Sequence, residues 1–478
     1  MMISQAYHRG NGPAGRRRRR RFASRLARGF ARLAAAFVLC LLAGANLAAQ
    51  DPVDQARRAL DAHRSDEARR LLEPYLQQDP GNAEAWYLHG VAAAELGDAA
   101  AARNSLEKAL NLDPRLFPAY TALADACVAA GDRQAAIRVL ERGLEQFPGD
   151  DLLLFRLGNL HLEAGDAQEA LGYLRRVAPL RAPAGYWETR GRAEMEAGQL
   201  EAALDSFRRA LDEKPDSVRL LQVLSGLALK LGQTEESWDY IAKARALAPE
   251  SPKVLYAFGV VSLENGLVAE AISAFRLLLL REPDEPDYLM MLGNAVLESP
   301  TEYSKAPDYF RRYVELRPED PVGHLMLGYS LYATRQYDAA VAELEKTLQM
   351  QPDSPEALYY LGMIAFDRNR DDEAIGYLQR VLADSERHMK AHLALGRIWL
   401  RQGKFAAAVA ELEKALELSG GTADIHYNLS RAYAQLGDRA KAAEHLKHYQ
   451  EFKKREEERE LRSRELRFLE RYRPGTSG

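Results

Sequence analysis

Small and large apolar residues recur along the chain with a period of about 34 residues. In each repeat a small residue, nearly always alanine, is followed four positions later by a large apolar residue, and another small residue comes about twelve positions earlier. Apolar residues spaced three and four apart form one face of a helix, so the pattern predicts helices throughout. The alanine position holds Ala68, Ala102, Ala136, Ala170, Ala203, Ser237, Ala271, Ala306, Ala340, Ala374, Ala408 and Ala442.

Glycine and proline divide the repeats into shorter segments. A glycine such as Gly97, Gly131 or Gly165 interrupts the apolar pattern in mid-repeat, and a proline such as Pro114 or Pro148 closes the repeat. Proline ends a helix because it lacks the N–H group and clashes with the preceding turn. Each repeat is therefore predicted to be a helical hairpin. Its small residues permit a close crossing of the two helices, and its large residue fills the space beside that crossing.

The pattern resembles the tetratricopeptide repeat (TPR) family. One repeat matches through Trp86, Gly90, Gly97, Ala102, Leu106, Ala109 and Pro114, and another through Trp187, Gly191, Gly198, Ala203, Phe207, Ala210 and Pro215. The resemblance implies an all-α fold. It is an α-solenoid in which about twelve TPR helical hairpins, over residues 50–454, stack into one right-handed superhelix.

Five positions depart from the family pattern. Pro300, Arg335 and Asn369 replace the mid-repeat glycine, and Glu386 and Gly420 stand where proline is expected. We expect these residues to change the geometry of individual turns without changing the fold.

Residues 1–49, called the leader below, differ from the repeats. They hold ten arginines and no acidic residue, and an apolar stretch from Leu33 to Ala49 follows the arginines. A basic segment, an apolar segment and terminal small residues are typical of a signal peptide. We therefore predict export to the periplasm or the cell exterior with removal of the leader. The alternative is an inner-membrane protein anchored by residues 33–49.

The leader hides the charge of the repeats. The chain carries 65 basic and 69 acidic residues, a formal net charge of −4. Without the ten leader arginines, 55 basic residues face 69 acidic ones, a net charge of −14. This charge does not favour a nucleic-acid partner. The 47% apolar content excludes a disordered chain, and two cysteines exclude a disulfide-stapled scaffold.

Residues 455–478 are rich in charge but retain scattered apolar residues such as Leu461 and Leu466. They are predicted to form a charged helix that caps the last repeat, because a solenoid needs a polar end for solubility. A partner-binding coiled coil is the alternative. The tail, residues 474–478, is predicted to be disordered.

No motif of a known catalytic or cofactor site occurs in the sequence. Two histidine pairs, His388 with His392 and His445 with His448, have the spacing of metal ligands, but no carboxylate is placed to complete either site. Cys127 stands at a position that packs between helices, so it is predicted to be a buried core residue. We therefore predict no enzymatic activity, no cofactor and no metal.

In the TPR family the first helix of each hairpin lines a concave groove, so the resemblance implies which side chains face a ligand. The groove aromatics are Tyr87, Phe155, Tyr256, Tyr329, Tyr359 and Tyr427. The groove acidic stripe consists of Glu95, Glu163, Glu196, Glu264, Glu298 and Asp367. The groove basic cluster consists of Lys390, Arg397, Arg401 and Arg431. The alternatives are packing against the next repeat for the aromatics and simple solvation for the charges.

The predicted function is a non-enzymatic protein–protein interaction scaffold that binds a peptide or partner protein along this groove, outside the cytoplasm. Groove aromatics would anchor a peptide, the acidic stripe would steer basic segments, and the basic cluster would hold a carboxylate, phosphate or acidic sugar. Resemblance to envelope TPR proteins gives an alternative, a structural component of a cell-envelope secretion, exopolysaccharide-export or outer-membrane assembly complex.

One binding device of the family is missing from the sequence. Some TPR proteins clamp a C-terminal carboxylate with lysine and asparagine side chains, and Asn159 and Asn294 occupy one of the asparagine positions. Phe155 and Met290, however, replace the first lysine, and the second asparagine is replaced by Thr189 and Met326. An adaptor for chaperone tails is therefore disfavoured.

Overall fold

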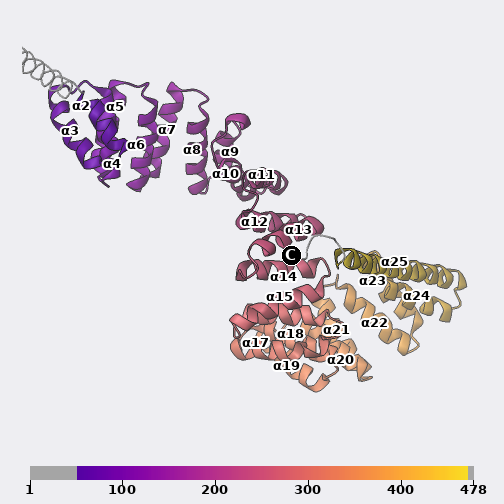
Figure 1. Cartoon of the computed structure of the whole chain (residues 1–478). Coiled ribbons are helices and arrows are strands. Elements are labelled where there is room, and N and C mark those ends of the chain that lie inside the picture. The colour runs from indigo at the N-terminus through magenta and orange to yellow at the C-terminus, as the bar shows by residue number, and fades with distance from the viewer. Residues whose placement is uncertain (1–50, 472–478) are drawn as a thin grey trace, which may run out of the picture. The chain divides into compact units, whose positions relative to one another are not determined.

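The structure, a computed structural model, describes residues 51–471, apart from the side chains of residues 384, 456 and 459–471 (Figure 1). The leader and the predicted disordered tail, residues 474–478, lie outside the described residues. From residue 51 to residue 471 the chain forms helices and turns and no strand, which confirms the all-α prediction. No helix in this range is long and apolar enough to cross a membrane.

The chain divides into two compact units, with the boundary between Glu213 and Lys214. Unit 1 contains five helical hairpins and unit 2 contains seven, so the predicted number of about twelve is confirmed. Unit 1 is formed by α2 (Pro52–Asp61), α3 (Ser65–Gln78), α4 (Ala83–Glu95), α5 (Ala99–Leu112), α6 (Phe117–Ala129), α7 (Arg133–Gln146), α8 (Asp151–Glu163), α9 (Ala167–Leu174), the 3-10 helix η1 (Pro179–Arg181), α10 (Tyr186–Glu196) and α11 (Leu200–Glu213).

Unit 2 contains the remaining helices. They are α12 (Val218–Lys230), α13 (Thr234–Leu247), α14 (Pro252–Glu264), α15 (Val268–Arg281), α16 (Pro286–Leu297), the 3-10 helix η2 (Tyr303–Lys305), α17 (Ala306–Leu316), α18 (Pro321–Ala333), α19 (Tyr337–Met350), α20 (Pro355–Asp367), α21 (Asp371–Asp384), α22 (Met389–Arg401), α23 (Phe405–Ser419), α24 (Ala423–Gln435) and α25 (Arg439–Arg471). Within each unit every helix packs on the next, and the hairpins stack as a solenoid (Figure 1).

The recurring small and large residues form the crossing inside each hairpin. A Cβ atom added to Gly90 of α4 would lie 2.5 Å from Leu106 Cγ of α5, and one added to Gly259 of α14 would lie 2.5 Å from Phe275 Cζ of α15. Leu106 and Phe275 are both 0% exposed. The predicted role of the small position, to let two helices approach closely, is confirmed.

The mid-repeat turn keeps a left-handed backbone where arginine or asparagine replaces its glycine. Gly97 has φ +79°, and the replacements Arg335 and Asn369 have φ +61° and +59°. The Arg335 N–H donates to the Tyr332 carbonyl oxygen at 2.9 Å, as the Gly97 N–H donates to the carbonyl oxygen of Ala94 at 3.0 Å. These two departures from the pattern therefore keep the turn, at a cost of about 1 kcal/mol each for placing a Cβ in this region.

The last hairpin differs from the predicted organisation. Helix α25 starts at Arg439 as the second helix of the hairpin, packs on α24, and continues without interruption over 33 residues to Arg471. Over residues 455–471 the predicted capping helix is therefore a continuation of α25.

Candidate functional site

The first helices of the hairpins lie on the inner side of each unit. Successive first helices contact one another, as α4 does α6 in unit 1, and α14 does α16 and α18 does α20 in unit 2. Contacts of the same extent do not occur between second helices of neighbouring hairpins in the described part of the chain. Closer spacing on one side curves a stack of hairpins toward that side, so the first helices line a concave groove.

The groove aromatics lie on first helices, but most of them pack against the next repeat. Tyr87, Phe155, Tyr256, Tyr329 and Tyr359 are half-buried, and Tyr427 is 44% exposed. Ring centroids are 6.4 Å apart for Phe155 and Tyr186, and 4.8 Å apart for the stacked pair Tyr329 and Tyr360. Five of the six groove aromatics therefore expose only part of the ring to a ligand in the groove.

A tyrosine cluster occupies the groove at α18 and α20. Tyr360 contacts the rings of Tyr329, Tyr332 and Tyr359 at centroid distances of 4.8, 5.7 and 5.3 Å. Burial raises the pKa of Tyr332 and of Tyr360, so both hydroxyls stay protonated at neutral pH and can donate a hydrogen bond. Tyr360 is not among the groove aromatics predicted from the sequence, although it directly follows Tyr359.

Two members of the groove basic cluster share one aromatic ring. The guanidinium carbons of Arg401 and Arg397 lie 3.9 and 5.2 Å from the ring centroid of Phe366. Arg401 also donates to the Phe366 carbonyl oxygen at 2.9 Å and pairs with Asp371 of α21. Arg401 therefore ties α22 to the preceding repeat, whereas Arg397 stays exposed.

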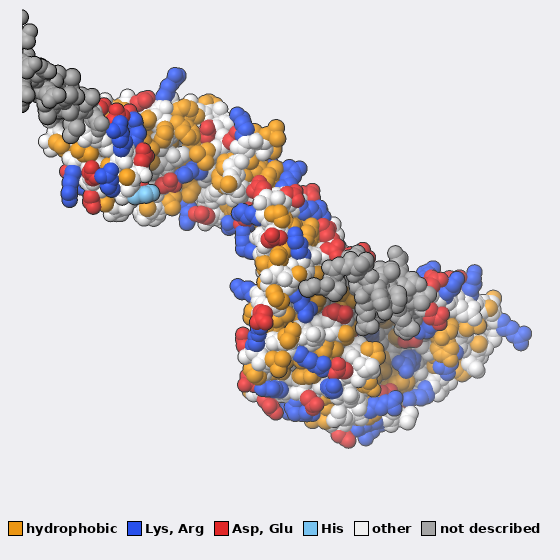
Figure 2. Space-filling view, in the orientation of Figure 1, with side chains coloured by type: hydrophobic (Ala, Val, Ile, Leu, Met, Phe, Trp, Pro, Cys, Tyr) orange, Lys and Arg blue, Asp and Glu red, His pale blue; other side chains and the backbone are white. Residues whose placement is uncertain are grey.

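The other two members lie apart from this ring. The Arg431 guanidinium carbon is 5.7 Å from the Tyr427 ring centroid on α24. Lys390 is exposed at the start of α22, and none of the described carboxylates pairs with it. Basic and acidic side chains are interspersed over the visible face in Figure 2, with hydrophobic side chains among them.

Half of the groove acidic stripe is bonded to the preceding hairpin. Glu95 accepts a hydrogen bond from Ser65, Glu163 lies 3.8 Å from the Arg133 guanidinium, and Asp367 accepts from the Tyr337 hydroxyl at 3.2 Å. Each of these partners is the first residue of the preceding second helix. For Glu196, Glu264 and Glu298 the structure contains no hydrogen-bond or ion-pair partner among the described residues.

A pocket of about 470 Å³, called the groove pocket below, opens where α14, α16 and α18 meet. It is lined by Leu263, Glu264, Met291, Asn294, Leu297, Glu298, Met326 and Tyr329. The pocket therefore joins two acidic-stripe residues, one groove aromatic and one of the asparagines considered for a carboxylate clamp. The sequence predicts that these four residues lie in the groove, but it does not predict that they line one pocket.

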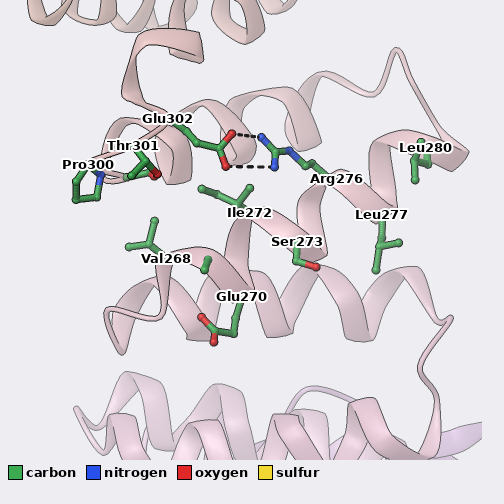
Figure 3. Close-up of a pocket in the computed structure, with 12 residues that line it drawn as sticks. Val268, Glu270, Ile272, Ser273, Arg276, Leu277, Leu280, Pro300, Thr301 and Glu302 are labelled. Carbon is green, nitrogen blue, oxygen red and sulfur yellow. Dashed lines mark hydrogen bonds and ion pairs between the residues drawn. The ribbon is translucent and has the colours of Figure 1, made fainter. Parts of the chain in front are cut away.

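A second pocket of about 560 Å³, the α15 pocket, lies between α15 and the turn 299–302. Figure 3 shows Arg276 reaching Glu302, with Leu277 and Leu280 further along the same helix. Arg276 Nη2 lies 2.5 Å from Glu302 Oε2 and Lys305 Nζ lies 2.8 Å from it. Hydrogen bonds from these two cations lower the pKa of Glu302 to about 2. Leu280 is 78% exposed, and this turn contains Pro300, in the repeat with one extra residue.

Two histidines form buried pairs with glutamates inside hairpins. His324 Nδ1 lies 2.5 Å from Glu343 Oε2, and His392 Nδ1 lies 2.6 Å from Glu411 Oε2. The Nε2 atom of each ring faces a backbone carbonyl, that of Pro318 for His324, at 2.9 Å. Both nitrogens of each ring therefore face oxygen atoms of the same hairpin or of the turn before it. These histidines hold hairpins together and are not open to a ligand.

A histidine cluster (His426, His445, His448) joins α24 to α25. His426 Nδ1 and His445 Nδ1 are 3.0 Å apart, and the His426 and His448 ring centroids are 5.0 Å apart. Burial, followed by the neighbouring histidine charges, lowers the pKa of His426. Among the side chains that the structure describes, no group of three or more histidines, cysteines, aspartates or glutamates is arranged to hold a metal ion. Cys127 is 1% exposed, as expected for a core residue.

The sequence matches models of one family along most of its length. Models described as tetratricopeptide repeat match residues 53–118, 117–160, 153–178, 188–252, 256–321, 325–387, 372–421 and 399–459. No curated protein matches the chain in sequence.

Several solved structures are similar to the chain. A tetratricopeptide repeat protein from Parabacteroides merdae is 18% identical, with 52% of this chain and 97% of that chain covered and a TM-score of 0.46. Yeast Tom70 is 15% identical, with 89% and 96% covered and a TM-score of 0.44. Cut9–Hcn1, an APC/C hetero-tetramer, is 15% identical, with 85% and 94% covered and a TM-score of 0.41.

Proposed function

Because the chain belongs to the tetratricopeptide repeat family, we propose that it is a non-enzymatic scaffold that binds an extended peptide or a partner protein along its concave groove. The observation that carries this proposal is the groove of unit 2 between α14 and α24. There, partly exposed tyrosine rings lie on α14, α18, α20 and α24. Glu298 at the end of α16 and Lys390 at the start of α22 have no ion-pair partner among the described side chains. A peptide laid across these helices would meet apolar and charged contacts in alternation.

The aromatic rings suit this role because their neighbours already hold them in place. Tyr256 packs against Tyr288 and Tyr329 stacks on Tyr360, so their side-chain entropy is largely lost before a ligand arrives. A pre-ordered ring offers contact area to a peptide at little further entropic cost. The same inter-repeat packing that stabilises the solenoid would therefore pre-organise the binding surface.

We further propose that the scaffold works outside the cytoplasm, either released after removal of the leader or anchored by residues 33–49. The arrangement of the leader, ten arginines followed by an apolar stretch ending in small residues, supports export. Cell fractionation followed by N-terminal sequencing tests this directly. A cytosolic protein that begins at Met1 would refute it.

Binding in the groove is tested by selecting random twelve-residue peptides displayed on phage against the purified full chain. The selected peptides are then measured against a groove variant and an outer variant that change charge by the same amount. The groove variant carries Lys390→Glu, Arg397→Glu and Tyr427→Ala; the outer variant, on second helices and η2, carries Arg380→Glu, Lys447→Glu and Tyr303→Ala. Tyr303, at 43% exposure, matches Tyr427, at 44%.

We expect the groove variant to lose about tenfold or more in affinity for the peptides, and the outer variant to bind as the wild type does. Circular dichroism of both variants checks that they remain folded. Equal binding by wild type and groove variant, or failure to select any peptide, would refute the proposal.

A further inference from the structure

The groove pocket brings together three polar groups that have no partner among the described residues. It is built from consecutive first helices, α14, α16 and α18, in the middle of unit 2. Its walls are the side chains of Leu263, Met291, Leu297 and Met326, together with Tyr329. The inference below rests on the proposed function, since it concerns what a groove ligand presents at this point.

The first of these polar groups is the amide oxygen of Asn294. Asn294 Oδ1 is buried and has no hydrogen-bond partner in the described part of the chain. The equivalent residue in unit 1 is Asn159, whose Oδ1 accepts a hydrogen bond from Thr189 Oγ1 at 2.9 Å. In the groove pocket, the repeat position of Thr189 is occupied by Met326, which cannot donate. A buried acceptor left without a donor costs about 1–3 kcal/mol, and a ligand N–H group would relieve this cost.

The other two groups are carboxylates at the ends of helices. Glu264 is the last residue of α14, and Glu298 is the C-cap of α16. The C-terminus of a helix carries a partial negative charge, which favours a cation and disfavours a carboxylate. Three other stripe members have a partner in the preceding hairpin, and for Glu163 that partner is the cation Arg133. The corresponding residue for Glu298 is Val268, which cannot pair with it.

The pocket therefore combines apolar walls with a negative rim and a buried acceptor. We propose that it binds a lysine or arginine side chain of an extended peptide. The methylene stem of that side chain lies along Met291 and Met326, and its charged end lies between Glu264 and Glu298. An N–H group of the ligand donates to Asn294 Oδ1. Methionine suits such walls because its flexible, polarisable side chain adapts to stems of different length.

The two methionines make the pocket observable. The full chain contains nine methionines, so methyl ¹³C labelling of methionine gives few signals, and Met291→Leu and Met326→Leu assign the two that matter. The probes are four acetylated, amidated peptides, Gly-Ser-Xaa-Ser-Gly, in which Xaa is lysine, arginine, norleucine or glutamate. Norleucine keeps the aliphatic stem of lysine and removes the charge.

We expect the lysine and arginine peptides to shift the Met291 and Met326 methyl signals, and the norleucine and glutamate peptides to bind about tenfold more weakly or not at all. Glu264→Gln with Glu298→Gln should weaken binding of the lysine peptide about tenfold. The matched control is Glu163→Gln with Glu196→Gln, which removes the same charge from the stripe in unit 1 and should leave binding unchanged. Met326→Thr restores the donor that Asn159 has, and should weaken binding while Met291 still reports it.

The outcomes separate this inference from the proposed function. If random peptides bind the groove but lysine and norleucine peptides shift the two methyl signals equally, the basic-residue pocket is refuted and the scaffold stands. The basic-residue pocket is also refuted if the control double variant, at Glu163 and Glu196, weakens binding as much as the double variant at Glu264 and Glu298. Net charge alone would then explain the weaker binding. If no peptide binds anywhere in the groove, both proposals fail.

Discussion

Replacing Gly259 with alanine should destabilise the α14–α15 hairpin, although alanine normally favours a helix over glycine. A Cβ at Gly259 would lie 2.5 Å from Phe275 Cζ, whereas ordinary contact begins at 3.4 Å, so the contact must open by about 0.9 Å. The Phe275 ring is 0% exposed and packs edge-on against Tyr256, with centroids 6.0 Å apart. It cannot move away without displacing a residue that lines the groove.

The magnitude follows from two opposing terms. Alanine gains about 1 kcal/mol over glycine inside a helix, and overpacking a well-packed core costs about 1–3 kcal/mol. The matched control is Gly226→Ala on the exposed side of α12, where an added Cβ meets nothing within 4 Å. The helix gain is common to both variants, so Gly226→Ala should exceed Gly259→Ala in stability by the overpacking term alone, about 2 kcal/mol.

A second substitution tests whether the contact is the cause. Changing Phe275 to leucine in the Gly259→Ala background recreates the pair Ala124 and Leu140, which is buried in the α6–α7 hairpin. We expect the double variant to recover about 1 kcal/mol relative to the sum of the two single changes.

The assay is amide hydrogen exchange of α14 and α15, with the urea midpoint of the full chain beside it, because a repeat array does not unfold in one step. Faster exchange confined to α14, α15 and the adjoining hairpins is the expected result for Gly259→Ala. Equal stabilisation by Gly259→Ala and Gly226→Ala would refute the close-crossing argument.

Three further predictions concern titratable groups. Arg276→Ala should raise the pKa of Glu302 from about 2 most of the way to about 4.3, which a carboxyl ¹³C titration measures. The stability that the Arg276–Glu302 pair contributes is present above the ordinary glutamate pKa and is lost as the pH falls toward 2. Burial lowers the folded-state pKa values of His426 and His445, so the stability that they contribute is full above about pH 6.5 and falls below it. His445→Gln should therefore reduce the difference in melting temperature between about pH 7.5 and 5.5 by a few degrees. Burial raises the pKa of the Cys127 thiol, so a thiol reagent should react with Cys127 only after denaturation. The denatured chain should then show one thiol if the leader has been removed and two if it is still present.

The sequence predicted the hairpins because their packing is set by residue size at fixed spacing. Gly90 with Leu106 and Gly259 with Phe275 are such pairs, and each meets within one hairpin of about 34 residues. The departures at Arg335 and Asn369 were correctly expected to leave the fold intact. No sequence feature predicts the boundary between compact units at residue 213, since the repeat pattern continues across it.

The state of each groove residue was harder to predict, because it depends on a neighbour in another hairpin. Tyr329 and Tyr360 are both visible as groove-side tyrosines, but only their stacking at 4.8 Å shows that each supports the other. Arg401 looked equivalent to Arg397 in the sequence. In the structure it is held by Asp371 and by a backbone carbonyl, so it contributes to stacking of the repeats more than to the surface.

These neighbours follow a rule that can be applied to sequence. A residue at the end of a first helix meets the residue that begins the second helix of the preceding hairpin, 30 positions earlier in the pairs Ser65 with Glu95 and Tyr337 with Asp367. The same rule joins Asp371 to Arg401, again 30 positions apart. For Glu298 the residue 30 positions earlier is Val268, the first residue of α15, which has no side-chain donor. A charge at this position is therefore structural where the facing residue bonds to it, as for Glu95 and Asp367, whereas Glu298 stays available to a ligand because Val268 cannot bond to it.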